Sequence, residues 1–308
     1  MSASAPKSTT DTDPDLQLTE EERELLSIRT VPEFEAAQAA RRRAKALAKA
    51  PESHLATVRS ARKINRILGE TYPYAVAELD FTNAFELLIA TVLSAQTTDV
   101  RVNQVTPALF ARYPDAPALA AAIEEEVEPY IQSLGFYRAK AKSIVKLARQ
   151  LTDDYDGEVP GTLDKLVKLA GVGRKTANVV LGNAFGVPGL TVDTHFGRLA
   201  RRMGFTTEDD PVKVEHDVAE LIEPREWTDF SHRMVYHGRR ICHARKPACG
   251  VCPIADLCPS WGEGETNETK ARKLMKYEMA PGRERLHLRF LTGATRRQLH
   301  AEGYPLSA

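Results

Sequence analysis

Two side chains able to do covalent chemistry stand near each other in the sequence. Lys175 follows a pair of glycines in LAGVGRK, and Asp193 lies 18 residues further on, in VDTH. A deprotonated lysine amine can attack a carbon atom and form a Schiff base. A nearby carboxylate can accept the ammonium proton and stabilise positive charge on the attacked group. Taken singly, Lys175 could be an exposed helix lysine and Asp193 a helix N-cap.

The chain has four cysteines, and all of them lie within 17 residues. Cys242, Cys249, Cys252 and Cys258 are separated by six, two and five residues. In a cytosolic chain such a cluster predicts metal binding rather than disulfides. Four thiolates suit either a tetrahedral zinc ion or an iron–sulfur cluster, and the spacing alone does not separate the two. Because protein fills all four positions, we expect no hydrolytic role for the metal.

The glycine pair predicts a tight turn between two apolar helices. Gly171 and Gly173 allow positive φ and let a foreign backbone come close. The amides that open the second helix can then hold a phosphate, so Gly171, Gly173 and Arg174 are expected to contact DNA. This is the pattern of a helix-hairpin-helix, a DNA clamp that ignores sequence. A helix C-cap followed by a new helix would also explain an isolated pair of glycines.

Together these motifs resemble the endonuclease III family of DNA glycosylases and AP lyases. The resemblance rests on LAGVGRKTANVV, VDTH, LSAQTTD at 93–99 and the cysteine run, and it covers about residues 56–262. The family has proline where Ala170 stands here. The resemblance implies that Lys175 attacks the sugar C1′ atom with help from Asp193, and that β-elimination then cuts the strand. It also implies that the four cysteines hold a 4Fe–4S cluster.

Chemistry at C1′ requires the nucleotide to leave the duplex, and wedge residues must fill the gap. The resemblance implies wedges at Gln96 and at Phe136, where the best-known relatives carry leucine, and Tyr137 beside Phe136 is a further expected DNA contact. The residues expected to line the base pocket are Ser94, Asp99 and His195. Ser94 could instead be an ordinary helix residue, and Asp99 the N-cap of the next helix.

Charge is balanced overall, with 42 basic and 42 acidic residues, but it is separated along the chain. Residues 11–24 carry seven acids against one arginine, whereas residues 231–247 carry five cations and no acid. This separation predicts a basic face, on which Arg245 and Lys246 clamp phosphates of double-stranded DNA. No apolar run is long enough for a membrane span, so we expect the protein in the bacterial cytoplasm. We also expect a monomer.

Apolar residues recur at helical spacing from residue 84 onward, and no stretch alternates as a strand would. We therefore predict an all-α, two-lobed helix-hairpin-helix glycosylase fold. A six-helix barrel lobe is expected over 78–188, and an iron–sulfur lobe over 56–77 and 189–262. Residues 1–55 are expected to form a mobile extension. The GEGETNET stretch after Pro259 is expected to be a linker, and residues 263–308 are expected to form a C-terminal tail with no assigned function.

The predicted function is base excision repair. The enzyme removes oxidised pyrimidines from duplex DNA through a lysine Schiff base and then cleaves the strand. One alternative is an adenine mismatch glycosylase of the same superfamily, which lacks the lysine and carries an extra C-terminal domain. The other is a noncatalytic DNA-binding module built around structural zinc, which would need no Asp193.

Overall fold

The computed structural model describes residues 53–73, 75–276, 288–289, 292–294 and 298–299. Within these ranges every regular element is a helix, so the all-α prediction is confirmed. The expected N-terminal extension over 1–55 lies outside the described residues except for its last three. No helix in the described ranges is both long and apolar enough to cross a bilayer.

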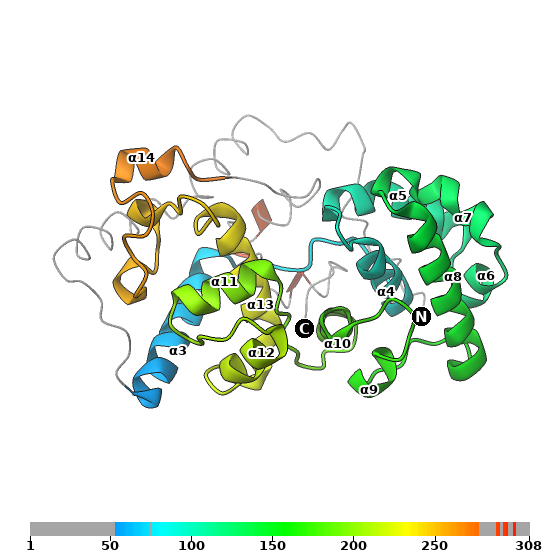
Figure 1. Cartoon of the computed structure of the whole chain (residues 1–308), viewed down its shortest axis with the longest axis horizontal. Coiled ribbons are helices and arrows are strands. Elements are labelled where there is room, and N and C mark those ends of the chain that lie inside the picture. The colour runs from blue at the N-terminus through cyan, green and yellow to red at the C-terminus, as the bar shows by residue number, and fades with distance from the viewer. Residues whose placement is uncertain (1–52, 74, 277–287, 290–291, 295–297, 300–308) are drawn as a thin grey trace.

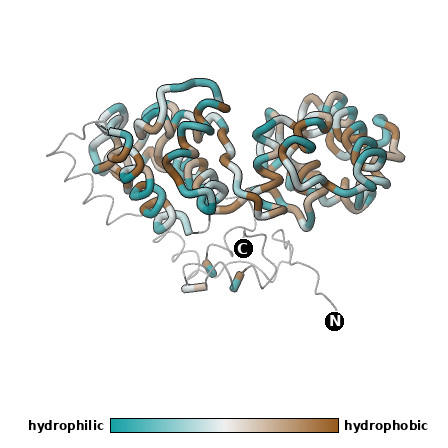
Figure 2. Tube along the Cα trace, turned by 90° about the horizontal axis from the view of Figure 1, so that it is seen from below, coloured by the Kyte–Doolittle hydropathy of each residue, from teal (hydrophilic) through white to brown (hydrophobic). Residues whose placement is uncertain are grey.

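The helices form two groups, which Figures 1 and 2 show as two bodies side by side. The first group comprises α4 (Ala84–Leu93), α5 (Asp99–Arg112), α6 (Ala116–Ala120), α7 (Glu124–Ile131), the 3-10 turn η2 (Gln132–Leu134), α8 (Tyr137–Tyr155), α9 (Leu163–Leu166) and α10 (Arg174–Ala184). The second group comprises α3 (His54–Thr71), α11 (Thr194–Arg202), α12 (Pro211–Ala219), η3 (Pro224–Glu226), α13 (Trp227–Arg240), η4 (Cys249–Val251), η5 (Ala255–Leu257) and α14 (Glu268–Arg272).

The first group is built around α4, which is buried on nearly all sides. Its sequence AFELLIATVL is apolar all round, as expected of a helix inside a bundle. Asn83 caps its N-terminus by accepting a hydrogen bond from the Glu86 amide at 2.9 Å. Helices α8 and α10 pack on α4 and bury the apolar sides of their own amphipathic patterns. This packing holds the glycine turn that precedes α10 against the core.

The second group has its own core, in which the early helix α3 packs against the late helix α13. Phe196 of α11 and Phe230 of α13 are fully buried and meet edge to face, with ring centroids 5.8 Å apart. Two separate cores agree with the predicted two-lobed architecture. The residue boundaries that we assigned to the lobes stay a prediction.

Polar contacts link the two groups of helices. Arg239 at the end of α13 pairs with Glu78 and with Asp99 at the start of α5. Arg174 at the start of α10 pairs with Glu215 of α12, its Nε donating at 2.7 Å. Charged bridges therefore tie the groups together next to two of the predicted site segments.

The stretch that follows the cysteines is not a free linker. The Gly250 amide donates to the Glu265 carbonyl at 2.8 Å, and the Glu265 amide donates to the Pro247 carbonyl at 2.9 Å. Ala271 of α14 is fully buried in the second core. The expected linker is thus wrong for these residues, because backbone pairing fixes them to the cysteine loop.

Candidate functional site

The glycine turn has the predicted hairpin form, with one correction. Gly171 has φ +75°, and a Cβ atom there would lie 3.2 Å from Val92 Cγ1. Gly173 has φ −92° and ψ 174°, which any residue can adopt. The expectation of positive φ is therefore wrong for Gly173, because this residue is the extended N-cap of α10. A Cβ atom on Gly173 would have no other heavy atom within 4 Å, so the space next to Gly173 is open.

The start of α10 offers unpaired amides to a ligand. Gly173 has no side chain with which to cap the helix, and the first helical backbone bond runs from the Ala177 amide to the Gly173 carbonyl. The amides of Arg174, Lys175 and Thr176 precede that bond, as at the start of any α-helix. Uncapped amides and the helix dipole favour an anion at this point.

Gln150 of α8 braces the hairpin. Its Oε1 accepts from the Ala170 amide at 2.7 Å, and its Nε2 donates to the Lys168 carbonyl at 3.4 Å. Proline, which the resembling family has at position 170, carries no amide hydrogen and could not make the first bond. Ala170 therefore lacks the rigidity of a proline ring, but its amide forms a hydrogen bond with Gln150 of α8.

Lys175 is the second residue of α10, and its side chain is exposed. Asp193 is the N-cap of α11, where its Oδ1 accepts from the Phe196 amide at 2.7 Å. The N-cap interpretation of Asp193 is thus confirmed. Since the cap uses one carboxylate oxygen, it fixes the orientation of the carboxylate without consuming its charge. Between these two described side chains there is no ion pair.

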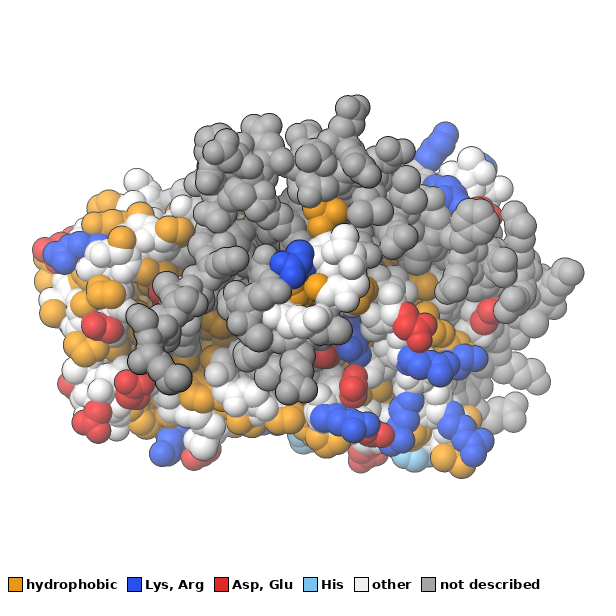
Figure 3. All heavy atoms as spheres, turned by 180° about the vertical axis from the view of Figure 1, so that it is seen from behind, with side chains coloured by type: hydrophobic (Ala, Val, Ile, Leu, Met, Phe, Trp, Pro, Cys, Tyr) orange, Lys and Arg blue, Asp and Glu red, His pale blue; other side chains and the backbone are white. Residues whose placement is uncertain are grey.

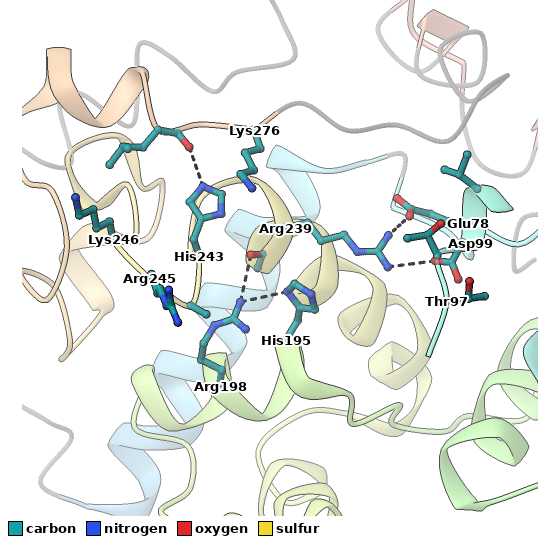
Figure 4. Close-up of a pocket in the computed structure, with 15 residues that line it drawn as sticks. Glu78, Thr97, Asp99, His195, Arg198, Arg239, His243, Arg245, Lys246 and Lys276 are labelled. Carbon is teal, nitrogen blue, oxygen red and sulfur yellow. Dashed lines mark hydrogen bonds and ion pairs between the residues drawn. The ribbon is translucent and has the colours of Figure 1, made fainter. Parts of the chain in front are cut away.

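A cavity of about 850 Å³ opens between the two groups of helices and the loop that follows α13. Figure 4 shows the side chains that point into it. Four predicted site residues line it together, namely Asp99, His195, Arg245 and Lys246. Ser94, Gln96, Phe136 and Lys175 do not line it.

Asp99 lies in the first turn of α5, but it is not the cap of that helix. Thr98 is the N-cap, and its Oγ1 accepts from the Arg101 amide. The alternative N-cap role for Asp99 is therefore wrong. Asp99 Oδ2 instead accepts from Arg239 Nη2 at 3.1 Å. Burial works to lower the pKa of Arg239, but the carboxylates of Glu78 and Asp99 raise it above its ordinary value.

His195 faces the cavity from the first turn of α11. Burial lowers its pKa below the ordinary value, the Asp193 carboxylate opposes this shift, and Arg198 and Arg239 add to it. Its Nδ1 lies 3.2 Å from Arg198 Nη2, which also donates to the Gly238 carbonyl. Because burial and two cations disfavour its charged form, His195 presents a neutral ring to the cavity near neutral pH.

Three predicted DNA-contact residues have a strained backbone. Gln96, Phe136 and Lys246 have φ values of 55°, 47° and 51°, a region that side chains other than glycine rarely adopt. The fourth such residue in the described ranges, Asp156, is the C-cap of α8, where this conformation is common. Strain of this kind concentrates at functional sites, since the surrounding fold has to maintain it.

The side chains around the first two strained positions differ in exposure. Phe136 is 72% exposed, although large apolar side chains are usually buried. Tyr137 beside it is half-buried, with Arg138 Cζ 5.6 Å from its ring centroid. Gln96 is exposed, whereas Ser94 is the C-cap of α4, and its Oγ donates to the Thr91 carbonyl of that helix at 2.8 Å. The role of Ser94 in the base pocket stays a prediction.

The basic face expected from residues 231–247 is smaller than the sequence indicates. Arg233 pairs with Glu226 and Asp229, and Arg240 is buried with its Cζ 4.3 Å from the Tyr236 ring centroid. Only Arg245 and Lys246 of that stretch are exposed cations. The face opposite to Figure 1 mixes acidic and basic side chains over the second group of helices (Figure 3).

Sequence reasoning missed the partners that hold the site together. Glu78 and Arg198 both line the cavity, yet neither belongs to a recognised motif. Arg239 was visible only as one of five cations in the basic stretch. Arg174 was predicted as a DNA contact, and its guanidinium is already bound to Glu215. Its role toward DNA stays a prediction.

The four cysteines line one cavity in the second group, together with Arg202, His237 and Trp261. Burial, followed by charge repulsion from Cys258 and Cys242, raises the pKa of Cys252 far above its ordinary value. Burial likewise raises the pKa of Cys242. Cys249 and Cys252 are buried, and Cys242 and Cys258 are half-buried. Four thiolates so close together are stable only around a group that supplies positive charge.

The donor set of this cavity fits an iron–sulfur cluster, because four thiols line one space and each can bind a different iron. Arg202 Nη1 donates to Cys242 Sγ at 3.3 Å, and His237 Nε2 lies 3.6 Å from Cys252 Sγ. Such contacts orient thiolate ligands and balance their charge.

Two parts of the chain match known protein families. Residues 89–224 match the HhH-GPD superfamily of base excision DNA repair proteins. Residues 242–258, which run from the first cysteine to the last, match the iron–sulfur binding domain of endonuclease III. The helical fold and the hairpin are thus those of a base excision repair protein, and the cysteines hold a 4Fe–4S cluster.

Similar proteins and solved structures identify the family more closely. The endonuclease III of Synechocystis is 52% identical over 201 residues, which are 65% of this chain and 92% of that protein. The Escherichia coli K12 enzyme is 45% identical over 194 residues, 62% of this chain and 90% of the relative. The structure of a non-covalent endonuclease III–DNA complex is 44% identical, with a TM-score of 0.63, and the match covers 70% of this chain and 98% of that one.

The chain belongs to the endonuclease III family. It is a bifunctional DNA glycosylase and AP lyase of base excision repair that acts on oxidised pyrimidines. Both alternatives considered from the sequence, the mismatch glycosylase and the zinc-structured module, are thereby set aside.

Proposed function

We propose that Lys175 is the nucleophile of this chain and that Asp193 is its acid–base partner. The observation that carries the proposal is the placement of the two side chains: Lys175 is exposed in the first turn of α10, beside the uncapped amides, and Asp193 is held as the N-cap of α11. Gln96, Phe136 and Lys246, which have a strained backbone, lie in three separate loops that were all assigned to DNA from the sequence. We assign these loops to one duplex that is opened at the lesion.

The reaction begins when Lys175 Nζ gives up a proton and forms a bond to the sugar C1′ atom. The Asp193 carboxylate, oriented by its cap to Phe196, accepts that proton and stabilises positive charge on the sugar as the base leaves. The C1′–O4′ bond then breaks, O4′ takes up a proton, and a protonated Schiff base forms between Nζ and C1′. The Schiff base makes the C2′ proton acidic. When water or a carboxylate takes that proton, a C2′–C3′ double bond forms and the phosphate leaves with the electron pair of the C3′–O bond.

DNA binding requires contacts on both sides of the lesion. We assign one phosphate to the open amides at Gly173, and others to Arg245 and Lys246 of the cysteine loop. Phe136 and Gln96 fill the gap that the nucleotide leaves, and the base enters the cavity beside Asp99 and the neutral His195.

The cluster supplies no step of the reaction. It neutralises four thiolates and thereby holds the loop that presents Arg245 and Lys246. One copy of the chain carries every residue named here, so we infer a monomer that acts on duplex DNA in the bacterial cytoplasm.

The test is covalent trapping. Duplex DNA that carries thymine glycol or an abasic site is incubated with the protein and borohydride, which reduces a Schiff base to a stable adduct. The wild-type chain and the control variant Lys213→Ala should give an adduct, and Lys175→Ala should give none. An adduct that persists in Lys175→Ala would remove the nucleophile from this position.

A second variant separates the two roles of Asp193. Asparagine is also a good N-cap, so Asp193→Asn keeps the start of α11 but loses the charge. We expect an unchanged melting temperature and a fall in base excision of about 10²-fold or more. Full activity in a folded Asp193→Asn variant would exclude the carboxylate from the chemistry.

A further inference from the structure

The segment from Glu263 to Lys276 lies beyond the matched iron–sulfur domain, which ends at residue 258. It is nevertheless built into that region. In its first part, the backbone of Glu265 forms hydrogen bonds with the backbones of Pro247 and Gly250. In its last part, the Lys276 amide donates to the Arg240 carbonyl at 3.1 Å. The segment therefore spans the cysteine loop and is attached on both sides of it; we call it the clamp.

Two independent features show that the clamp is a built contact. A Cβ atom on Gly250 would lie 2.6 Å from the Thr266 carbonyl oxygen, so the approach of the clamp requires glycine at this position. Ala271 in the middle of the clamp is fully buried. Backbone pairing, close approach and burial together fix the path of the chain up to Lys276.

The end of the clamp reaches the cavity. His243 Nε2 lies 2.9 Å from the Leu274 carbonyl, which joins the clamp to the loop that carries Arg245 and Lys246. Leu274 and Lys276 both line the cavity, and the Lys276 side chain is exposed. Figure 4 shows Lys276 beside His243, on the same side of the cavity as Arg245 and Lys246.

We propose that Lys276 is a further phosphate-binding residue for DNA, presented by the clamp. The inference rests on the proposed function, because it takes the cavity as the place where DNA lies. An exposed ammonium group on this wall is a third cation beside Arg245 and Lys246, and a duplex backbone offers phosphates in series. The backbone bond at Lys276 orders its main chain before DNA arrives, which lowers the entropy lost on binding.

The salt dependence of binding tests this role. Each phosphate neutralised by a protein cation steepens the slope of log K against log salt by about 0.9 for duplex DNA. The probe is a duplex that carries a tetrahydrofuran abasic analogue, which has no aldehyde and forms no Schiff base. We expect Lys276→Gln to make the slope shallower by about 0.9. The control Lys270→Gln removes an exposed lysine from the same clamp, away from the cavity, and should leave the slope unchanged.

Arg245→Gln separates failure of this inference from failure of the proposed function. If Arg245→Gln flattens the slope and Lys276→Gln does not, the role of Lys276 is overturned and the DNA site stands. If neither variant changes the slope, the placement of DNA at this cavity is wrong, and the inference falls with it. The visible absorbance of the cluster, unchanged in all three variants, shows that the loop has kept its structure.

Discussion

The hairpin before α10 and the loop between Cys242 and Cys249 are both assigned to DNA phosphates, yet they are built in opposite ways. The hairpin offers backbone amides, and its own turn, the Gly171 conformation and two hydrogen bonds with Gln150 hold it in place. The cysteine loop offers cationic side chains, and the backbone of Lys246 in it is strained. The hairpin carries its stability in local geometry, whereas the loop depends on a cofactor and on the distant clamp.

This difference has a consequence for how each element fails. A helix N-terminus binds an anion through fixed partial charges, which need no side chain to be ordered. Two long cations must be ordered by the structure beneath them, and the cysteine loop has no regular helix of its own between Cys242 and Cys249. Loss of the cluster should thus disable the cysteine loop as a phosphate-binding element and leave the hairpin in place.

Removing the cluster should produce the largest effect. In Cys249→Ser the three remaining thiols cannot hold the cluster in its normal form, and the binding energy of a structural metal site is part of the folding energy of its loop. We expect residues 242–276 to lose protection from hydrogen exchange while α10 keeps it. Equal loss of protection in both regions would show that the hairpin also depends on the cluster.

The two glycines of the hairpin should respond differently to alanine. Gly171→Ala is expected to destabilise the fold by about 1–3 kcal/mol, because φ is +75° and Val92 is close. Gly173→Ala should change stability by less than about 0.5 kcal/mol, since its φ is negative and its Cβ would meet nothing. Urea unfolding measures both values.

The same pair separates stability from binding. A methyl group on Gly173 occupies the open space in which we place a phosphate, so DNA affinity should fall although stability does not. A Gly173→Ala variant with full affinity for the abasic-analogue duplex would place the phosphate elsewhere.

Removing the brace at Gln150 should have an intermediate effect. Gln150→Leu leaves the Ala170 amide without its partner, at a cost of about 1 kcal/mol. Adding Ala170→Pro to this variant removes the unsatisfied amide, so the double variant should recover part of the loss in thermal unfolding. If Ala170→Pro destabilises the wild type and the Gln150→Leu variant equally, the two positions are not coupled.

Lys246→Gly should change stability about as much as Gln150→Leu does, but in the opposite direction. Glycine relieves the left-handed backbone at φ 51° and should raise stability by about 1 kcal/mol. It also removes a cation, so binding should weaken and the salt slope should flatten by about 0.9. A melting temperature that rises while affinity falls would show that strain at this residue serves DNA binding. A fall in both would show that the lysine supports the loop.

Much of the fold could be predicted from local pattern. Apolar spacing located helices such as α4, α8 and α10, because a helix buries one face and its period shows in the sequence. The hairpin and the four cysteines were found from spacing alone, since a turn and a metal loop are both short-range structures. The linker expected after the cysteines was wrong, because nothing in GEGETNET reveals its pairing with Pro247 and Gly250.

The sequence by itself determined which reactive groups are present: an amine after a glycine turn, a carboxylate 18 residues later, and four thiols at a fixed spacing. The tertiary structure alone decided which charges remain available. Arg239 is bound to Glu78 and Asp99, and Arg174 to Glu215, whereas Arg245, Lys246 and Lys276 are exposed at the cavity. The reason is distance in the chain, because an ion pair between residues 41 or more positions apart leaves no local pattern. Arg239 lies 161 positions from Glu78.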